Sequence, residues 1–241
     1  MKRHFNWTNL RLVLIFSLVV FLYSFSSKRN ENRKLLKSTV EFVGNDQLFV
    51  THETVNKLLI ENNKDASAIR KVALDLNSLE KSINNHEMVE KSEVFVSVDG
   101  VLKAVVKQKT PVVRIVTSQE SYYLDYMGTK MPLSEIHTAR VPLVKGTITN
   151  ENKQLVSDLF RYIYADEFLR KNIIGVEILP SGSVKMKNRN FDFTIEFGKI
   201  INVEEKFKNY QAFFQKAVQD KTIEKYKNIN LKFTQQVVCT K

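Results

Sequence analysis

An apolar run near the N-terminus, Leu10 to Phe25, sets the first limit on what this chain can become. A helix that crosses a membrane needs about 20 mainly apolar residues. The run is slightly short of that length, but Arg11 can keep its charge at the interface while its stem stays in apolar surroundings. We therefore expect a transmembrane helix over residues 10–27, preceded by an N-terminal tail of residues 1–9.

A cleaved signal peptide is the alternative interpretation of the same run. Lys2, Arg3 and Arg11 provide a basic start, and a short apolar core is typical of such leaders. No clear A-x-A cleavage site follows, however, and the core is rich in Leu, Val and Phe. These two features favour an uncleaved anchor.

Charge leaves the orientation of this anchor open. More basic residues follow the run than precede it, which by simple count would place the rest of the chain in the cytoplasm. Long domains, however, cross membranes largely regardless of such charges. We expect residues 28–37 to be a basic linker, either a solvated stop-transfer segment or a contact for lipid headgroups.

Residues 38–109 begin as one strand followed by two helices. Val40 and Phe42 alternate with their neighbours in a short strand that closes at the turn pair Gly44-Asn45. Thr51 is a candidate N-cap for a helix beginning at His52. A second helix is expected over Ser78–His86, with Asn77 as its cap.

A hairpin completes this first domain. Val94, Val96 and Val98 share one face of a β-rich run, and a second such run follows Asp99-Gly100. An Asp-Gly pair between two strands predicts a type I′ turn, which needs positive φ at both central residues. The order is therefore β-α-α-β-β, and the Lys109-Thr110-Pro111 break is the expected domain boundary.

Residues 110–241 are expected to form an α+β domain with a mainly antiparallel sheet. Short strands recur after the boundary, and helices are expected over Gln154–Leu169 and Val203–Lys221. The stretch Phe191–Gly198 alternates apolar and polar residues strictly, which indicates one buried and one solvated face. Asn228–Lys241 then predicts a single closing strand, with Leu231 and Phe233 on one face.

No reactive constellation is visible in the sequence. The four histidines lack metal-ligand spacing, and the lone Cys239 has no neighbouring base. Glu204 and Glu205 fit the first turn of a helix, where they favour its dipole, better than a catalytic pair. The net charge of +11 is spread over lysines without a basic stripe between stacking aromatic residues. We expect no catalytic residue, cofactor, metal, small-molecule substrate or nucleic acid.

Several motifs, in their order, resemble the bacterial cell-division protein family FtsQ (DivIB). Residues 38–109 resemble its POTRA domain, a module that binds extended chains. Three short stretches of the second domain are also similar to family motifs: "YYLDYMGTKMPL" (Tyr122–Leu133), "VPLVKG" (Val141–Gly146) and "NINLKF" (Asn228–Phe233).

The resemblance implies a non-enzymatic scaffold at the division septum. Its domains would lie outside the cytoplasmic (inner) membrane, held by one helix whose N-terminal tail, residues 1–9, is cytoplasmic. The implied partners are single-pass division proteins of the FtsB (DivIC) and FtsL types, together with the septal wall synthase complex. The resemblance also implies that the protein helps regulate septal wall synthesis.

The resemblance also implies a docking site on the closing strand, where an FtsB-type partner would add a strand of its own. Lys232 would meet an acid of the partner, and Phe233 would fill an apolar notch. The expected partner-binding residues are Asn230, Leu231, Lys232, Phe233, Thr234, Gln235, Gln236 and Val237. Without the resemblance, pairing of this strand on both sides within its own domain is the favoured expectation.

Two other functions stay open at this point. An envelope enzyme acting on wall polymer needs converging acids or a nucleophile, and the sequence does not display them. An outer-membrane assembly factor would also carry POTRA units, but such proteins add a membrane barrel for which this chain is too short.

Overall fold

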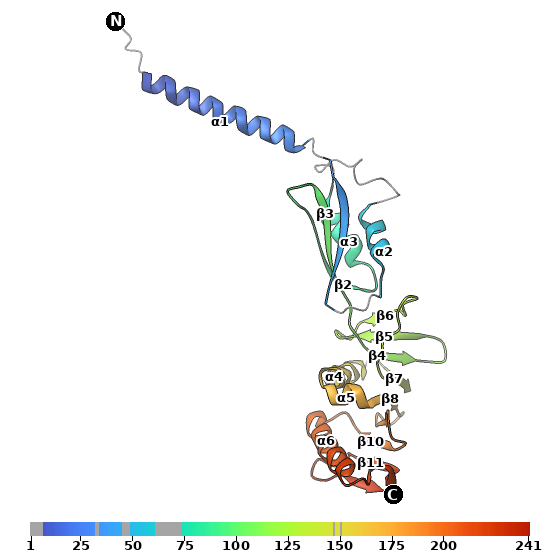
Figure 1. The fold of residues 1–241 in the computed structure, drawn as a ribbon. Coiled ribbons are helices and arrows are strands. Elements are labelled where there is room, and N and C mark those ends of the chain that lie inside the picture. The colour runs from blue at the N-terminus through green and yellow to red at the C-terminus, as the bar shows by residue number, and fades with distance from the viewer. Residues whose placement is uncertain (1–6, 32–33, 45–48, 61–73, 147, 150) are drawn as a thin grey trace. The chain divides into compact units, whose positions relative to one another are not determined.

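The computed structural model describes residues 7–31, 34–44, 49–60, 74–146, 148–149 and 151–241. The chain divides into two compact units (Figure 1). The first runs to Gln108, and the second spans Lys109–Lys241 and also includes Phe49.

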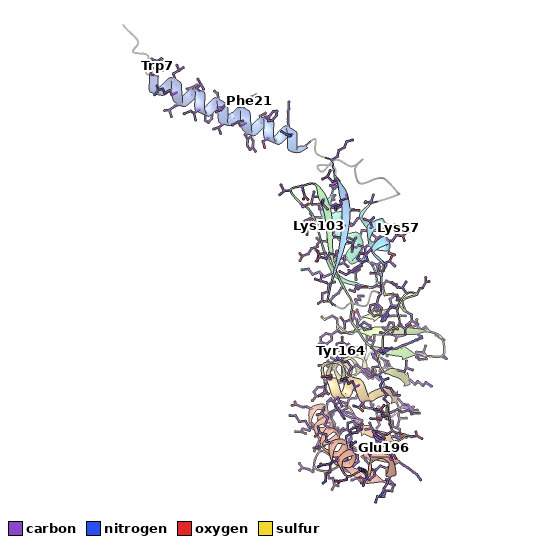
Figure 2. All side chains as sticks on the ribbon, viewed as in Figure 1. Trp7, Phe21, Lys57, Lys103, Tyr164 and Glu196 are labelled. Atoms are coloured by element: carbon purple, nitrogen blue, oxygen red, sulfur yellow. The ribbon has the colours of Figure 1, made fainter. Side chains whose placement is uncertain are left out.

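Helix α1, Trp7–Glu31, contains the predicted membrane segment and extends beyond it at both ends. Its segment Leu10–Arg29 is long and apolar enough to cross a membrane, and none of it is buried against the rest of the protein. The side chains of Trp7 and Phe21 project from this helix and are exposed (Figure 2). By length and composition, α1 fits either a single-pass anchor or a signal sequence.

The first unit contains a three-stranded sheet covered by two helices, in the predicted order β-α-α-β-β. The strands lie in the order β1-β3-β2, with β1 parallel to β3 and β2 antiparallel to it. Helix α2 packs on β1, and α3 packs on β2 (Figure 1). The elements are β1 (Lys37–Val43), α2 (His52–Leu59), α3 (Leu76–Asn84), β2 (Val89–Val96) and β3 (Val101–Gln108).

One of the two predicted helix caps is confirmed and the other is wrong. The Thr51 hydroxyl accepts a hydrogen bond from the Thr54 backbone N–H at 3.0 Å, as an N-cap should. Helix α3 instead begins at Leu76, because the Asp75 carboxylate accepts from the Ser78 N–H at 3.1 Å. Asn77, the predicted cap, lies inside the first turn.

The hairpin is confirmed, but its predicted type I′ turn is wrong. Among the described residues of this turn only Gly100 has a positive φ, of 87°, so Asp99 does not adopt the left-handed conformation. The Gly100 N–H donates to the Ser97 carbonyl, and the Ser97 N–H donates to the Val101 carbonyl. The turn is thus a three-residue loop closed by a left-handed glycine, the next commonest hairpin solution.

The second unit is built on one mixed nine-stranded sheet. Its strand order is β12-β11-β10-β9-β8-β7-β4-β5-β6. The strands are β4 (Pro111–Val116), β5 (Ser121–Asp125), β6 (Lys130–Met131), β7 (Leu143–Gly146), β8 (Ile173–Ile178), β9 (Val184–Asn188), β10 (Thr194–Gly198), β11 (Asn228–Asn230) and β12 (Val238–Thr240).

Antiparallel pairs predominate in this sheet, as predicted, but three pairs are parallel: β4 with β7, β7 with β8, and β10 with β11. Two of these have a direct cause. Helices connect β7 to β8 and β10 to β11, and a helical crossover returns the chain to the end at which the first strand began. The "VPLVKG" stretch is confirmed as extended, since β7 lies within it.

The helices of the second unit are α4 (Lys153–Ala165), α5 (Glu167–Asn172), α6 (Val203–Gln219) and the 3-10 turn η4 (Ile223–Lys225). Figure 1 shows α4, α5 and α6 along one side of the sheet. Their buried faces, which include Phe160, Ile163, Phe207 and Tyr210, join the inner strand residues in one core.

The predicted single helix over Gln154–Leu169 is wrong, because Asp166 divides it. Asp166 has an extended backbone, and its carboxylate accepts from the Leu169 N–H at 2.8 Å, which caps α5. The predicted strand from Phe191 is also too long. It begins at Thr194, and the rings of Phe191 and Phe193 stack in the segment before it.

Some predictions lie outside the described residues. They concern residues 1–6 of the expected tail, 32–33 of the expected linker, and residues 45–48, with Asn45 of the expected turn, and 61–73 of the expected first domain.

Candidate functional site

The predicted single closing strand is wrong, because the chain turns back on itself. Strand β11 ends at Asn230, residues 231–237 form an irregular connection, and β12 returns antiparallel to β11 with Asn230 opposite Val238. The turn has a local cause. The Asn230 side-chain oxygen accepts from the Lys232 N–H at 3.0 Å, an interaction that competes with continued strand pairing.

At this end of the sheet the edge therefore lies at β12 rather than at residues 231–237, and β6 forms the opposite edge. Strand β11 is enclosed between β10 and β12, and β12 is the last strand in the order. In the part of the chain that the structure describes, no strand pairs with the outer side of β12. An edge of this kind presents backbone N–H and C=O groups to a further strand.

The core holds β12 in place by one face. Val237 and Cys239 pack against the core, whereas Val238 is 43% exposed and Thr240 is exposed. This alternation is that of a strand with one buried and one solvated face. Burial raises the pKa of the Cys239 thiol, which fits a packing role better than a reactive one.

The predicted partner-binding residues divide into three groups. Asn230 ends β11, and Leu231 is buried in the core with its N–H donating to the Glu196 carbonyl at 2.9 Å. Thr234 and Val237 are half-buried. The exposed members are Lys232, Phe233, Gln235 and Gln236.

Phe233 stands out in the exposed group, because its aromatic side chain is 53% exposed and so presents apolar surface to water. The connection that carries it is fixed to the last long helix. The Asn209 side-chain amide donates to the Thr234 carbonyl at 2.8 Å. Phe233 and the edge of β12 thus belong to one hairpin at the end of the sheet.

An acid on β10 organises the base of this hairpin (Figure 2 labels Glu196). One carboxylate oxygen of Glu196 accepts from the Lys232 ammonium at 2.6 Å, and the other accepts from the Asn228 amide at 3.0 Å. The hydrogen bond from Lys232, and then that from Asn228, holds the pKa of Glu196 below its ordinary value. Lys232 was expected to face a partner's acid, and it already has an acid of its own chain.

The histidines that the structure describes take structural positions. The ring of His52 meets Phe42 edge-on, that of His137 meets Phe49, and the His86 ring accepts from the Met88 N–H. Over the described ranges, no group of three His, Cys, Asp or Glu side chains is placed to hold a metal ion.

Sequence reasoning did not anticipate a hollow of about 540 Å³ on strands β7 to β10. Leu143, Lys145, Gly175, Lys185 and Lys187 are among its lining residues. Alternation could have indicated it, because Lys185 and Lys187 share a face of β9. A short apolar run could have indicated β12, since Val238 and Cys239 follow the polar residues Gln235 and Gln236.

Comparison with known proteins gives one finding for this unit. Residues 110–240 match the family model described as FtsQ/DivIB, C-terminal related. No curated protein matches the chain. The matched range begins at the domain boundary and includes every strand of the large sheet, from β4 to β12.

Proposed function

Because the chain belongs to the FtsQ/DivIB C-terminal related family, we propose that it is a membrane-anchored scaffold of the bacterial division complex. The family match over residues 110–240 is the observation that carries this proposal. Proteins of this family are in general non-catalytic, so the expected activity is binding. The chain recruits single-pass division proteins of the FtsB/DivIC and FtsL types and helps regulate septal wall synthesis.

The topology follows from the same proposal. Helix α1 remains attached as a single-pass anchor of the cytoplasmic membrane, with the N-terminus in the cytoplasm. Both folded units lie outside that membrane, at the septum. The first unit acts as a POTRA domain, for which its order of two helices between the first and second strands of a three-stranded sheet is the support.

The docking site is the edge of β12 together with the exposed residues of the connection before it. A partner segment adds a strand outside Val238–Thr240, and its backbone pairs with that of β12. The edge is preorganised, because Val237 and Cys239 are packed on the core before a partner arrives. Its short length is also a common protection of edge strands against uncontrolled pairing.

Side chains of the connection supply specificity. Phe233 is exposed enough to enter an apolar notch of the partner. The Lys232 side chain keeps 49% of its surface accessible beside Glu196, so it can meet a partner carboxylate without leaving its own ion pair. Gln235 and Gln236 are exposed and offer hydrogen bonds at the rim.

The test compares two lysine substitutions at valines of equal exposure. Val238→Lys places a charge on the edge strand, a common natural block to strand addition. Val218→Lys is the matched control, because Val218 is 44% exposed and lies on α6. Full-length variants are purified from membranes, and the bound FtsB/DivIC-type and FtsL-type proteins are identified and quantified.

We expect Val238→Lys to remove the FtsB/DivIC-type partner and Val218→Lys to retain it. Phe233→Ala should weaken the complex by about tenfold or more, as expected of a buried aromatic anchor. Equal partner recovery with both lysine variants would overturn the docking site. Recovery of no division protein with the wild-type chain would overturn the scaffold function itself.

A further inference from the structure

The tip of the first hairpin carries apolar side chains that are highly exposed to solvent. Val98 is 86% exposed, the highest value among the large apolar residues that the structure describes. Leu36 is 67% exposed and lies beside it, because the Leu36 N–H donates to the Gly100 carbonyl at 2.9 Å. Two aliphatic side chains thus share one end of the small sheet.

This tip is fastened to the chain that leaves α1. A Cβ atom on Gly100 would lie 3.3 Å from the Lys34 carbonyl oxygen, so backbone meets backbone there. Only three peptide units separate Lys34 from Glu31, the last residue of α1. Since consecutive Cα atoms are about 3.8 Å apart, the two Cα atoms cannot be more than about 11 Å apart.

The end of α1 lies near the membrane surface if this helix is an anchor. The last large apolar residue of the run is Phe25, and α1 continues for six residues to Glu31. Six helical residues cover about 9 Å, which is close to the depth of one headgroup layer, about 5–8 Å. The short connection therefore holds the tip of the hairpin next to the headgroups.

The charges around the tip are mainly positive. Lys34, Lys37 and Lys103 stand against one acid, Asp99, whose pKa is lowered first by a hydrogen bond from Ser97 and less by the charges of Lys103 and Lys37. Lys37 opposes Val101 and Thr39 opposes Lys103 across β1 and β3, so the two lysines lie on the same face (Figure 2 labels Lys103). Three lysines against one aspartate leave a net positive end.

We propose that this tip, formed by Leu36, Val98 and the lysines at positions 34, 37 and 103, binds the surface of an anionic phospholipid membrane. The proposal rests on the anchoring of α1 that is part of the proposed function. Leu36 and Val98 enter the boundary between headgroups and acyl chains, and the lysines meet lipid phosphates.

A weak contact suffices in this arrangement. The connection keeps the tip within reach of the membrane, which converts lipid binding into an intramolecular event with a high effective concentration. The consequence is orientation. A unit held by its connection and by its hairpin tip cannot rotate freely about the anchor, so its helices present a fixed side to neighbouring proteins.

The test uses the full chain in vesicles of phosphatidylethanolamine and phosphatidylglycerol. In a Cys239→Ser background, single cysteines replace Val98, Val43 or Ser17 and are labelled with a polarity-sensitive fluorophore. Val43 is the matched control, because it is also an exposed valine but ends β1, six residues from Lys37. At about 3.3 Å per residue it lies about 20 Å away along the strand. Ser17 reports whether α1 is in the bilayer.

We expect lipid-borne quenchers to quench the labels at Ser17 and Val98 but not the label at Val43. The double variant Lys34→Glu with Lys103→Glu should lower the quenching at Val98 about twofold or more, as should vesicles of neutral phosphatidylcholine. If Ser17 is quenched while Val98 behaves like Val43, the membrane contact is wrong and the anchor stands. If Ser17 is not quenched, the anchor is wrong and the contact falls with it.

Discussion

The ammonium of Lys232 lies 2.6 Å from a carboxylate oxygen of Glu196, and this ion pair fastens the connection after β11 to the middle of β10. The same acid also holds Asn228 through its second oxygen, at 3.0 Å, and Leu231 through its backbone carbonyl, at 2.9 Å. One glutamate thus fixes three positions at the base of the C-terminal hairpin.

Lys232→Met should lower the free energy of unfolding of the second unit by about 0.5–1 kcal/mol near neutral pH, as expected of a partly exposed ion pair. The pKa of Glu196 is lower in the folded chain than the ordinary 4.5, so its contribution is present above that value and is lost as the pH falls through the lowered pKa. Amide hydrogen exchange of the full chain in detergent, measured across this range, provides the free energies.

Glu196→Gln provides the control for this prediction, because it removes the titrating group and should show no such pH dependence. A difference between wild type and Lys232→Met that persists under strongly acidic conditions would contradict the ion pair. The pair also makes Lys232→Glu a poor probe of partner binding, since that change would place two carboxylates face to face.

Local signals in the first unit predicted its architecture well. The alternation of Val40 and Phe42, the cap at Thr51 and the Asp99-Gly100 pair all correspond to observed elements. The errors were local choices between near-equivalent solutions. Asp75 and Asn77 are both residues that favour the N-cap position. Asp75 is the cap in the folded chain because its backbone is extended, whereas Asn77 is already helical.

Long-range pairing in the second unit could not be obtained from periodicity. The stretch from Asn228 reads as one strand because Leu231, Phe233 and Val237 have the right spacing. In the fold Leu231 is buried, whereas Phe233 is exposed, because Asn230 and Glu196 hold the backbone in a turn. Strand β12 therefore forms this edge of the sheet. Its position depends on the contacts of β11 and Lys232 with β10, which join residues more than thirty apart in sequence.

Gly146→Ala should destabilise the second unit by about 3 kcal/mol or more. Gly146 has a φ of 111° and ends β7, and an added Cβ would lie 2.1 Å from the Ile178 carbonyl oxygen on β8. The clash would be with backbone atoms of Ile178, so no flexible side chain could move aside to relieve it. The parallel pairing of β7 with β8 should open, which faster amide exchange over Leu143–Gly146 would report.

Gly182→Ala is the matched control for this substitution. Gly182 also has a positive φ, of 75°, but an added Cβ would meet nothing within 4 Å. Only the backbone penalty applies, about 1–2 kcal/mol. Equal losses of stability at the two glycines would show that the close approach to Ile178 is not what requires Gly146.

Tyr210→Phe should lower the free energy of unfolding of the second unit by about 1–2 kcal/mol. The Tyr210 hydroxyl is fully buried and accepts from the Asn188 amide at 3.0 Å, and burial raises the pKa of this phenol far above its usual range. Asn188→Ala should cost more, because the Asn188 oxygen also accepts from the N–H groups of Asn190 and Phe191. Thermal or urea unfolding that ranks Tyr210→Phe as the more damaging change would contradict this network.

Lys206→Met should lower the stability of the second unit near neutral pH and remove a rise in its stability at alkaline pH. The Lys206 side chain is 1% exposed, and its ammonium donates to the carbonyls of Phe197 at 3.0 Å and Lys199 at 2.9 Å. Loss of both bonds leaves two acceptors without this donor, a cost of about 1–3 kcal/mol.

Burial lowers the pKa of Lys206 below the ordinary 10.5. Between the folded and unfolded pKa values the unfolded chain holds more protons, so the free energy of unfolding of the wild type rises with pH. The difference in unfolding free energy between wild type and Lys206→Met should therefore grow over that window, and a constant difference would show that the amine is not desolvated in the folded protein.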